Sequence, residues 1–158
     1  MDLGILAPHV GLYFVIGMLL GPYGALGAAS ANIILDLLDG FTLFEIIPSA
    51  IFSFGVSCLA YKLWYSGIKT DKVTKPVLDN IYHLTLFLSI LIVCGFIYST
   101  FHANLLRFNV SPEIDEFFFV SYLMNFVNLG FIFGIVGIWI SKKNRFHRDS
   151  KTIKKTSQ

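Results

Sequence analysis

Apolar residues fill most of this chain in long blocks, and short polar or glycine-rich stretches separate the blocks. A helix needs roughly 20 apolar residues to cross the hydrocarbon core of a bilayer. Five blocks reach or approach that length and predict membrane-spanning helices at about residues 4–20, 24–39, 48–64, 78–102 and 117–140. The pattern therefore predicts an all-α integral membrane domain over residues 1–140, followed by a polar, basic and mobile tail over residues 141–158.

A Gly-Pro pair, Gly21-Pro22, separates the first two predicted spans. Proline has no backbone amide hydrogen and disfavours the helical conformation of the residue before it, so the helix should break here. The connection is short, and we expect the two spans to form a close hairpin. Pro48 stands at a favoured first helical position and predicts the start of the third span. The preceding segment 41–47 is then expected to lie at the membrane interface.

Composition supports a membrane protein and excludes several other classes. Charged residues make up 14% of the chain, against roughly 25% in an ordinary soluble domain. The net charge of +2 is too small to suggest a nucleic-acid partner. The four histidines are scattered without a second ligand at metal spacing, and no catalytic or phosphate-binding motif is present. We therefore predict no enzymatic activity, no cofactor and no metal.

Basic residues concentrate in two stretches and predict the orientation. These stretches are the loop after the third span, with Lys62, Lys69, Lys72 and Lys75, and the tail, with Lys142, Lys143, Arg145, Arg148, Lys151, Lys154 and Lys155. Basic residues close to span ends favour the cytoplasmic side, so both stretches are predicted to be cytoplasmic in a multi-pass protein of the cell (plasma) membrane. The N-terminus is then outside. Because Met1 lacks a basic leader, we expect the natural start to lie one helix upstream.

Polar residues inside the predicted spans are the candidate binding residues. Ser121, Asn125 and Asn128 fall within about 60° of one another around a helix. An amide in hydrocarbon is costly unless it is hydrogen-bonded, and an intramembrane carboxylate is a candidate functional group. We predict that an outward-opening pocket gathers Asn32, Asp36, His102, Ser121, Asn125 and Asn128. The alternative is that these groups form interhelical hydrogen bonds and bind no ligand.

Small residues recur at helical spacing in the first, second and fifth predicted spans and in the turn between the first two. They are Gly17, Gly21, Ala25, Ala29, Gly130, Gly134 and Gly137. Small side chains let helix backbones approach closely inside a membrane. The spacing is compatible with packing inside the protein and with a surface for a partner helix.

The stretch "LGILAPHVGLYFVIGMLLGPYGALGAASANIILDLLDG" resembles the substrate-binding S components of energy-coupling-factor vitamin transporters. The resemblance is carried by Pro8, by the Gly-Pro-x-Gly-Ala turn at residues 21–25, and by Asp36-Leu37-Leu38 with Gly40. "SFGVSCLAYKLWY" at residues 53–65 is similar to the next helix of that family. Beyond residue 65 only hydropathy and length are similar.

The resemblance implies a compact six-helix membrane fold that binds a small, vitamin-type molecule on its outer side. It also implies a transmembrane coupling subunit with two ATPases as partner. The same fold serves as a sensory input domain of signalling kinases and phosphatases, which is the alternative function. Only five spans are predicted here, so the first helix of the family would be missing. Ala25 and Ala29 match the spacing of a coupling motif of the family, but on a different helix, so that role is not transferred.

Overall fold

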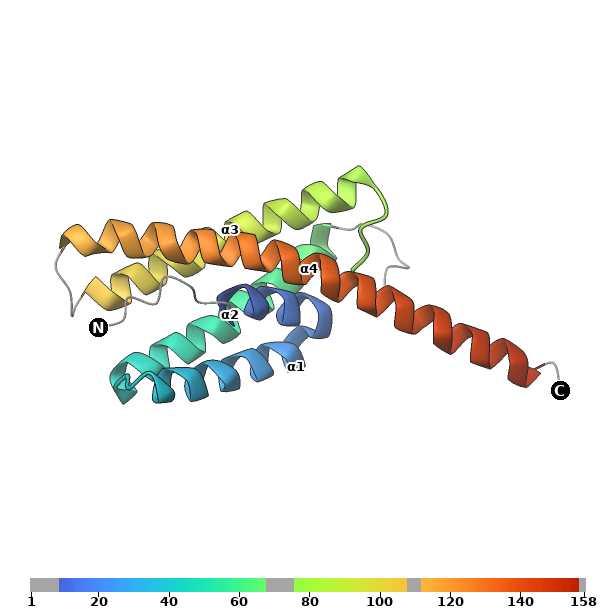
Figure 1. Ribbon diagram of the computed structural model, residues 1–158, viewed down its shortest axis with the longest axis horizontal. Coiled ribbons are helices and arrows are strands. Elements are labelled where there is room, and N and C mark those ends of the chain that lie inside the picture. Colours follow the sequence, from blue (N-terminus) through green and yellow to red (C-terminus); the bar gives the residue numbers. More distant parts are fainter. Residues whose placement is uncertain (1–8, 68–75, 108–111, 157–158) are drawn as a thin grey trace.

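The computed structural model describes residues 9–67, 76–107 and 112–156, and these residues form helices without strands (Figure 1). The helices are α1 (His9–Leu38), α2 (Leu43–Gly67), α3 (Ile81–Arg107) and α4 (Pro112–Thr156). Each contains a segment long and apolar enough to cross a membrane: His9–Leu38, Leu43–Ser66, Ile81–Leu105 and Phe118–Lys143. The chain is therefore an all-helical, multi-pass membrane protein.

Within the described residues, four helices meet this criterion of length and composition, and the predicted count of five is not confirmed. The first two predicted spans form the two halves of α1, which meet at Gly21. Gly21 has φ 63° and ψ −143°, a backbone conformation that only glycine adopts readily. The predicted break at Gly21-Pro22 is confirmed. The first half of α1 is short: its described part begins at His9, and it ends at the break at Gly21.

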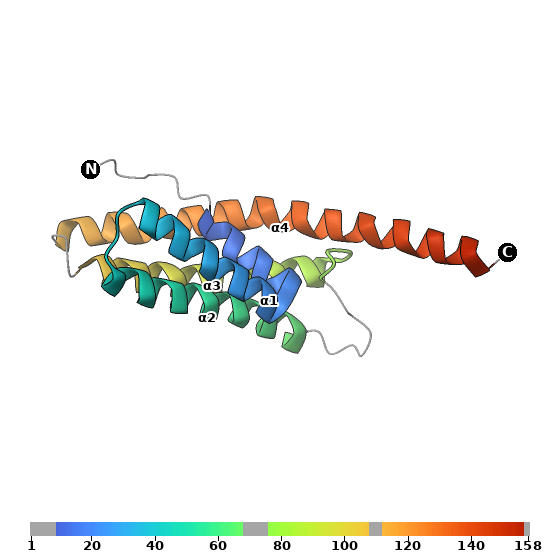
Figure 2. The same cartoon turned by 90° about the horizontal axis from the view of Figure 1, so that it is seen from below.

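The two halves of α1 fold back on each other, as Figures 1 and 2 show from two directions. A Cβ atom built on Gly24 would lie 2.3 Å from the carbonyl oxygen of Ile16. In a straight helix residues eight apart are about 12 Å apart along the axis. The glycine at position 24 thus permits the backbones to touch just after the turn.

The first half of α1 is the centre of the hydrophobic core. Val10, Phe14 and Met18 are fully buried in it. The Phe14 ring lies 5.5 Å from the ring of Phe87 in α3 and 6.1 Å from that of Phe126 in α4. On the side towards α2, a Cβ on Gly17 would lie 2.4 Å from the carbonyl oxygen of Ser57. This half-helix therefore packs against all three other helices.

The glycines of α4 face this centre. A Cβ on Gly130 would lie 2.6 Å from a methyl carbon of Leu91 and one on Gly134 2.3 Å from the ring of Phe87. Gly137 lies against Val15 and Leu19 in the same way. Of the other small residues, Gly21 is buried against Tyr61, Ala25 is buried and Ala29 is half-buried. Packing within the chain therefore explains why α4 has glycine at these three positions of its inner face.

Helix α2 begins at Leu43, before Pro48, where the sequence predicted the start of the third span. The Glu45 carboxylate accepts hydrogen bonds from the backbone amide of Thr42 at 2.8 Å and from its hydroxyl at 2.7 Å. The carbonyl oxygen of Thr42 in turn accepts hydrogen bonds from the backbone amides of Glu45 and Ile46. A Thr-x-x-Glu sequence stabilises a helix start in this way, and here it adds a turn to α2.

Helix α4 continues well beyond the apolar segment, to Thr156, and projects from the bundle in Figures 1 and 2. The predicted tail is helical over residues 141–156, which continue the helix of the last span without interruption. At the point of exit the exposed Trp139 has the Lys143 ammonium 5.5 Å from its ring centroid. This pairing of aromatic and basic side chains is typical of a membrane interface.

Candidate functional site

A chain of hydrogen bonds joins polar side chains of α1, α2 and α3 inside the apolar bundle. The Asn32 amide nitrogen donates to the carboxylate of Asp36 at 2.7 Å and to the hydroxyl oxygen of Ser49 at 2.8 Å. The Ser49 hydroxyl oxygen lies 3.3 Å from Nε2 of His102. Nδ1 of His102 lies 3.2 Å from the carbonyl oxygen of Tyr98. We call Asn32, Asp36, Ser49 and His102 the polar network.

The pairing in the polar network fixes the direction of its hydrogen bonds. Both amide hydrogens of Asn32 are used, so Ser49 accepts one of them and its own hydrogen is free for Nε2 of His102. Nδ1 of His102 then carries a hydrogen and donates it to Tyr98. A neutral imidazole satisfies both contacts.

Burial differs along the polar network. Asn32 is 1% exposed, Ser49 4% and His102 7%, whereas Asp36 is half-buried. Asp36 lies one turn from Asp39, which is exposed at the end of α1. The polar network therefore leads from the exposed end of α1 to the interior of the bundle.

Aromatic rings surround His102, which is the buried end of the polar network. The ring of Tyr98 stacks on that of His102 at 4.0 Å, and the Tyr122 ring of α4 lies 5.3 Å from the same imidazole. Tyr13 of α1 contacts Tyr98 at 6.3 Å between ring centroids. All four helices thus contribute to the surroundings of His102.

Buried hydroxyl groups without a hydrogen-bond partner among the residues described include those of Tyr13, which is 2% exposed, and Ser99, which is fully buried on α3. An unpaired buried hydroxyl lowers stability, and a native protein that keeps one calls for an explanation. A bound polar molecule or water would satisfy them.

The structure joins three of the six predicted pocket residues, Asn32, Asp36 and His102, by hydrogen bonds through Ser49. Ser121 and Asn125 are half-buried on α4, and Ser121 adjoins Tyr122 in sequence. Asn128 is exposed on the outer face of α4. The glycine face of α4 packs inward, so the opposite, amide-bearing face turns partly away from the bundle.

Sequence reasoning missed Ser49 and the tyrosines. A signal for Ser49 was present, because Ser49, Ser53 and Ser57 recur every four residues along α2. All three are buried, and the Ser57 hydroxyl donates to the carbonyl oxygen of Tyr13 at 2.9 Å. Such a stripe marks the face of a membrane helix that packs on other helices. The tyrosines carry no comparable local signal.

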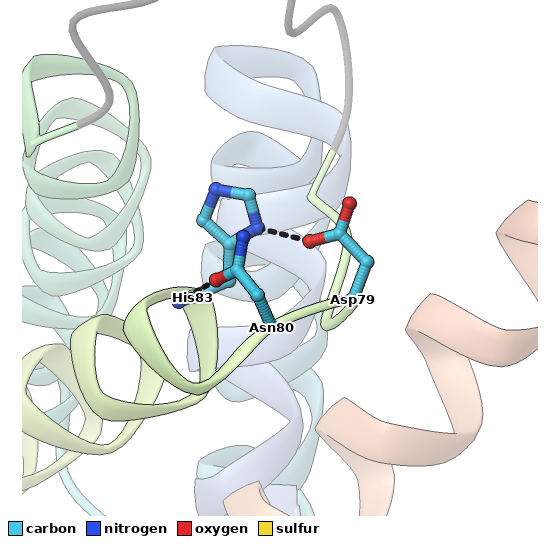
Figure 3. A network of polar contacts seen from close by, with 3 residues as sticks. All are labelled: Asp79, Asn80 and His83. Atoms are coloured by element: carbon cyan, nitrogen blue, oxygen red, sulfur yellow. Dashed lines mark hydrogen bonds and ion pairs between the residues drawn. The ribbon is translucent and has the colours of Figure 1, made fainter.

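A second polar cluster, shown in Figure 3, caps the start of α3. The side-chain oxygen of Asn80 accepts a hydrogen bond from the backbone amide of His83 at 2.8 Å, the arrangement of a helix N-cap. The His83 ring is hydrogen-bonded to the Asp79 carboxylate, which lowers the pKa of Asp79. The cluster is local to the helix start and explains why α3 begins at Ile81.

Metal binding finds no support in the described part of the chain, where no group of three or more histidine, cysteine or acidic side chains lies close enough to hold an ion. Comparison with protein-family models, curated proteins and solved structures finds no match to this chain. The fold and the polar network thus define an all-helical membrane protein with a hydrogen-bonded polar network inside an apolar bundle. The function is therefore inferred from the residues of the polar network and their surroundings.

Proposed function

We propose that this protein binds a small polar molecule within the membrane, as an S-component-like substrate-binding subunit of an energy-coupling-factor transporter. The observation that carries the proposal is the hydrogen-bonded polar network of Asn32, Asp36, Ser49 and His102. Polar groups inside a membrane are costly and are usually retained for function. The network assembles from three helices, which is a common construction of a ligand site between helices.

The chemistry of the site suits a small, water-soluble and partly aromatic molecule. The half-buried Asp36 carboxylate offers hydrogen-bond acceptors close to the exposed end of α1. Tyr98, His102 and Tyr122 offer ring surfaces and polar atoms deeper in the bundle. The unpaired hydroxyl of Tyr13, whose ring contacts Tyr98, would supply a further contact for a ligand. A vitamin-type molecule combines these requirements.

A second candidate function, a sensory input domain, has one specific observation in its favour. Helix α4 runs from the membrane segment Phe118–Lys143 to Thr156 as a single helix. A continuous helix that leaves the bundle can transmit a change in packing around Gly130 and Gly134 to a domain outside the membrane. The ligand site would then act in signalling to a kinase or phosphatase.

Affinity purification of the tagged chain from native membranes, followed by identification of the retained proteins, separates the two functions. Recovery of a transmembrane coupling subunit with two ATPases supports transport, and recovery of a kinase or phosphatase supports sensing. Ligand binding is tested independently by thermal unfolding of the purified protein with a panel of water-soluble vitamins. A ligand raises the unfolding temperature, and Asn32→Leu should abolish the shift.

A variant at an exposed polar position of the same helix, Ser30→Ala, is the matched control and should retain the shift. The Ser30 hydroxyl donates to the carbonyl oxygen of Leu26 at 2.9 Å and lies outside the polar network. Binding that survives in Asn32→Leu would reject this location for the site.

A further inference from the structure

Asn128 places an unpaired amide on the outer surface of the membrane-spanning part of α4. It is the eleventh residue of the 26-residue span Phe118–Lys143, which puts it within about 4 Å of the middle of the span at 1.5 Å per residue. Its side chain is exposed and makes no hydrogen bond to any residue that the structure describes. An amide at this depth would face hydrocarbon.

Three other exposed polar side chains of the bundle, including the exposed amide of Asn104, bond to their own helix instead. Ser30 donates to the Leu26 carbonyl at 2.9 Å, Thr100 to the Phe96 carbonyl at 2.8 Å, and Asn104 to the Thr100 carbonyl at 2.6 Å. These groups carry little cost in lipid because their donors are satisfied. Asn128 has no such hydrogen bond to its own helix, so its amide needs a hydrogen-bond partner from outside the chain.

The residues next to Asn128 form an apolar ridge. They are spaced by four and each is about half exposed: Val120 54%, Met124 58%, Ile132 53% and Val136 47%. Rows of residues spaced by four are the ridges by which helices pack on one another. The opposite, glycine-bearing face of α4 already packs inside the bundle, so this ridge is free for contact with another helix.

We propose that this ridge is a dimer interface and that the partner is a second copy of this chain. Two copies inserted in the same direction are related by a twofold axis along the membrane normal, which brings each residue opposite its own counterpart at equal depth. An amide has both donors and an acceptor, so two Asn128 side chains can pair reciprocally. A different protein would need a polar group at this same depth by coincidence.

The test uses the full chain reconstituted in phospholipid vesicles, with donor and acceptor dyes attached at the C-terminus of separate copies. Energy transfer should rise with the protein-to-lipid ratio, as expected for a dimer. Asn128→Leu should weaken association about three- to thirtyfold, the range that interhelical hydrogen bonds supply in membranes. Asn104→Leu, which removes an exposed amide satisfied within its helix, should associate as tightly as the wild type.

A photo-crosslinking residue at position 124 should yield crosslinked dimers, whereas the same residue at position 51 should not. Ile51 is similarly exposed, at 66%, but lies on α2. This measurement leaves Asn128 intact, so it holds even where Asn128→Leu impairs folding. A monomeric wild type at all ratios, equal association of Asn128→Leu, or crosslinks from position 51 alone would overturn the proposal. Because the ridge is apart from the polar network, these outcomes do not bear on ligand binding.

Discussion

The amide nitrogen of Asn32 on α1 lies 2.8 Å from the hydroxyl oxygen of Ser49 on α2, and both side chains are buried. This contact joins two helices inside the apolar bundle and passes the hydrogen-bond chain on to His102. A satisfied buried network adds rigidity, whereas a broken one leaves costly unpaired groups. The Asn32–Ser49 contact is therefore expected to be as important for stability as for ligand binding.

Replacement of Asn32 by leucine should lower the free energy of unfolding by about 1–3 kcal/mol, the cost of leaving buried polar partners unsatisfied. The substitution removes both donors to Asp36 and Ser49 while it keeps similar volume. Denaturant unfolding in mild detergent measures the change. The control Ser30→Ala should change stability by less than about 0.5 kcal/mol, as typical of surface substitutions. Equal effects of the two substitutions would show that the network contributes little.

The membrane character and three members of the polar network, Asn32, Asp36 and His102, were predictable from the sequence, but Ser49 and the details of the fold were not. The break at Gly21-Pro22 is local, so the sequence predicts it. The length of α2 depends on the Thr42–Glu45 cap, and the half-helix before Gly21 depends on burial among all the other helices. The contact of Tyr122 with His102 joins residues from different helices and cannot be derived from spacing along one helix.

Gly21→Ala should strongly destabilise the protein, because the backbone conformation at this residue costs an L-residue about 1–3 kcal/mol. A Cβ at this position would also lie 3.1 Å from the ring of Tyr61. The matched control is Gly27→Ala, in the second half of α1, where a Cβ would meet nothing within 4 Å. There alanine should stabilise the helix by up to about 1 kcal/mol. Thermal unfolding in detergent compares the two, and a tolerated Gly21→Ala would contradict the conformation described for the turn.

Gly17→Ala tests the packing of the central half-helix on α2. A Cβ at Gly17 would lie 2.4 Å from the backbone oxygen of Ser57, so the helices would have to move apart. Overpacking of this kind costs about 1–3 kcal/mol. Gly55→Ala is the control, since a Cβ there meets nothing within 4 Å. A loss of stability in Gly17→Ala alone is the expected outcome of unfolding measurements, and similar stabilities would argue against this close approach.

Acid should remove the contribution of the Asp79–His83 pair at the start of α3. The hydrogen bond from His83 lowers the pKa of Asp79 in the folded state. The pair therefore contributes stability above the ordinary aspartate pKa of about 3.9 and loses it as the pH falls through the lower folded value. The stability difference between wild type and Asp79→Asn should be present at neutral pH and vanish in acid. Asn80→Ala removes an uncharged cap and should cost about 1 kcal/mol at every pH; a parallel pH dependence for both variants would contradict this assignment.

The variant Tyr13→Phe tests whether the Tyr13 hydroxyl contributes to the stability of the protein or to ligand binding. The Tyr13 hydroxyl is buried and has no hydrogen-bond partner in the described ranges, so its removal should leave the ligand-free protein equally stable or more stable. If the hydroxyl contacts a bound molecule, the same variant should lose about tenfold in affinity, equivalent to roughly 1.4 kcal/mol for one hydrogen bond. Unfolding without ligand measures the change in stability. A binding titration, with any molecule that stabilises the wild type, measures the change in affinity. Phenylalanine has the same ring as tyrosine and lacks only the hydroxyl, so the ring at position 13 should pack without rearrangement. A less stable ligand-free variant would instead show that the hydroxyl has a structural partner, and unchanged affinity would place the ligand away from Tyr13.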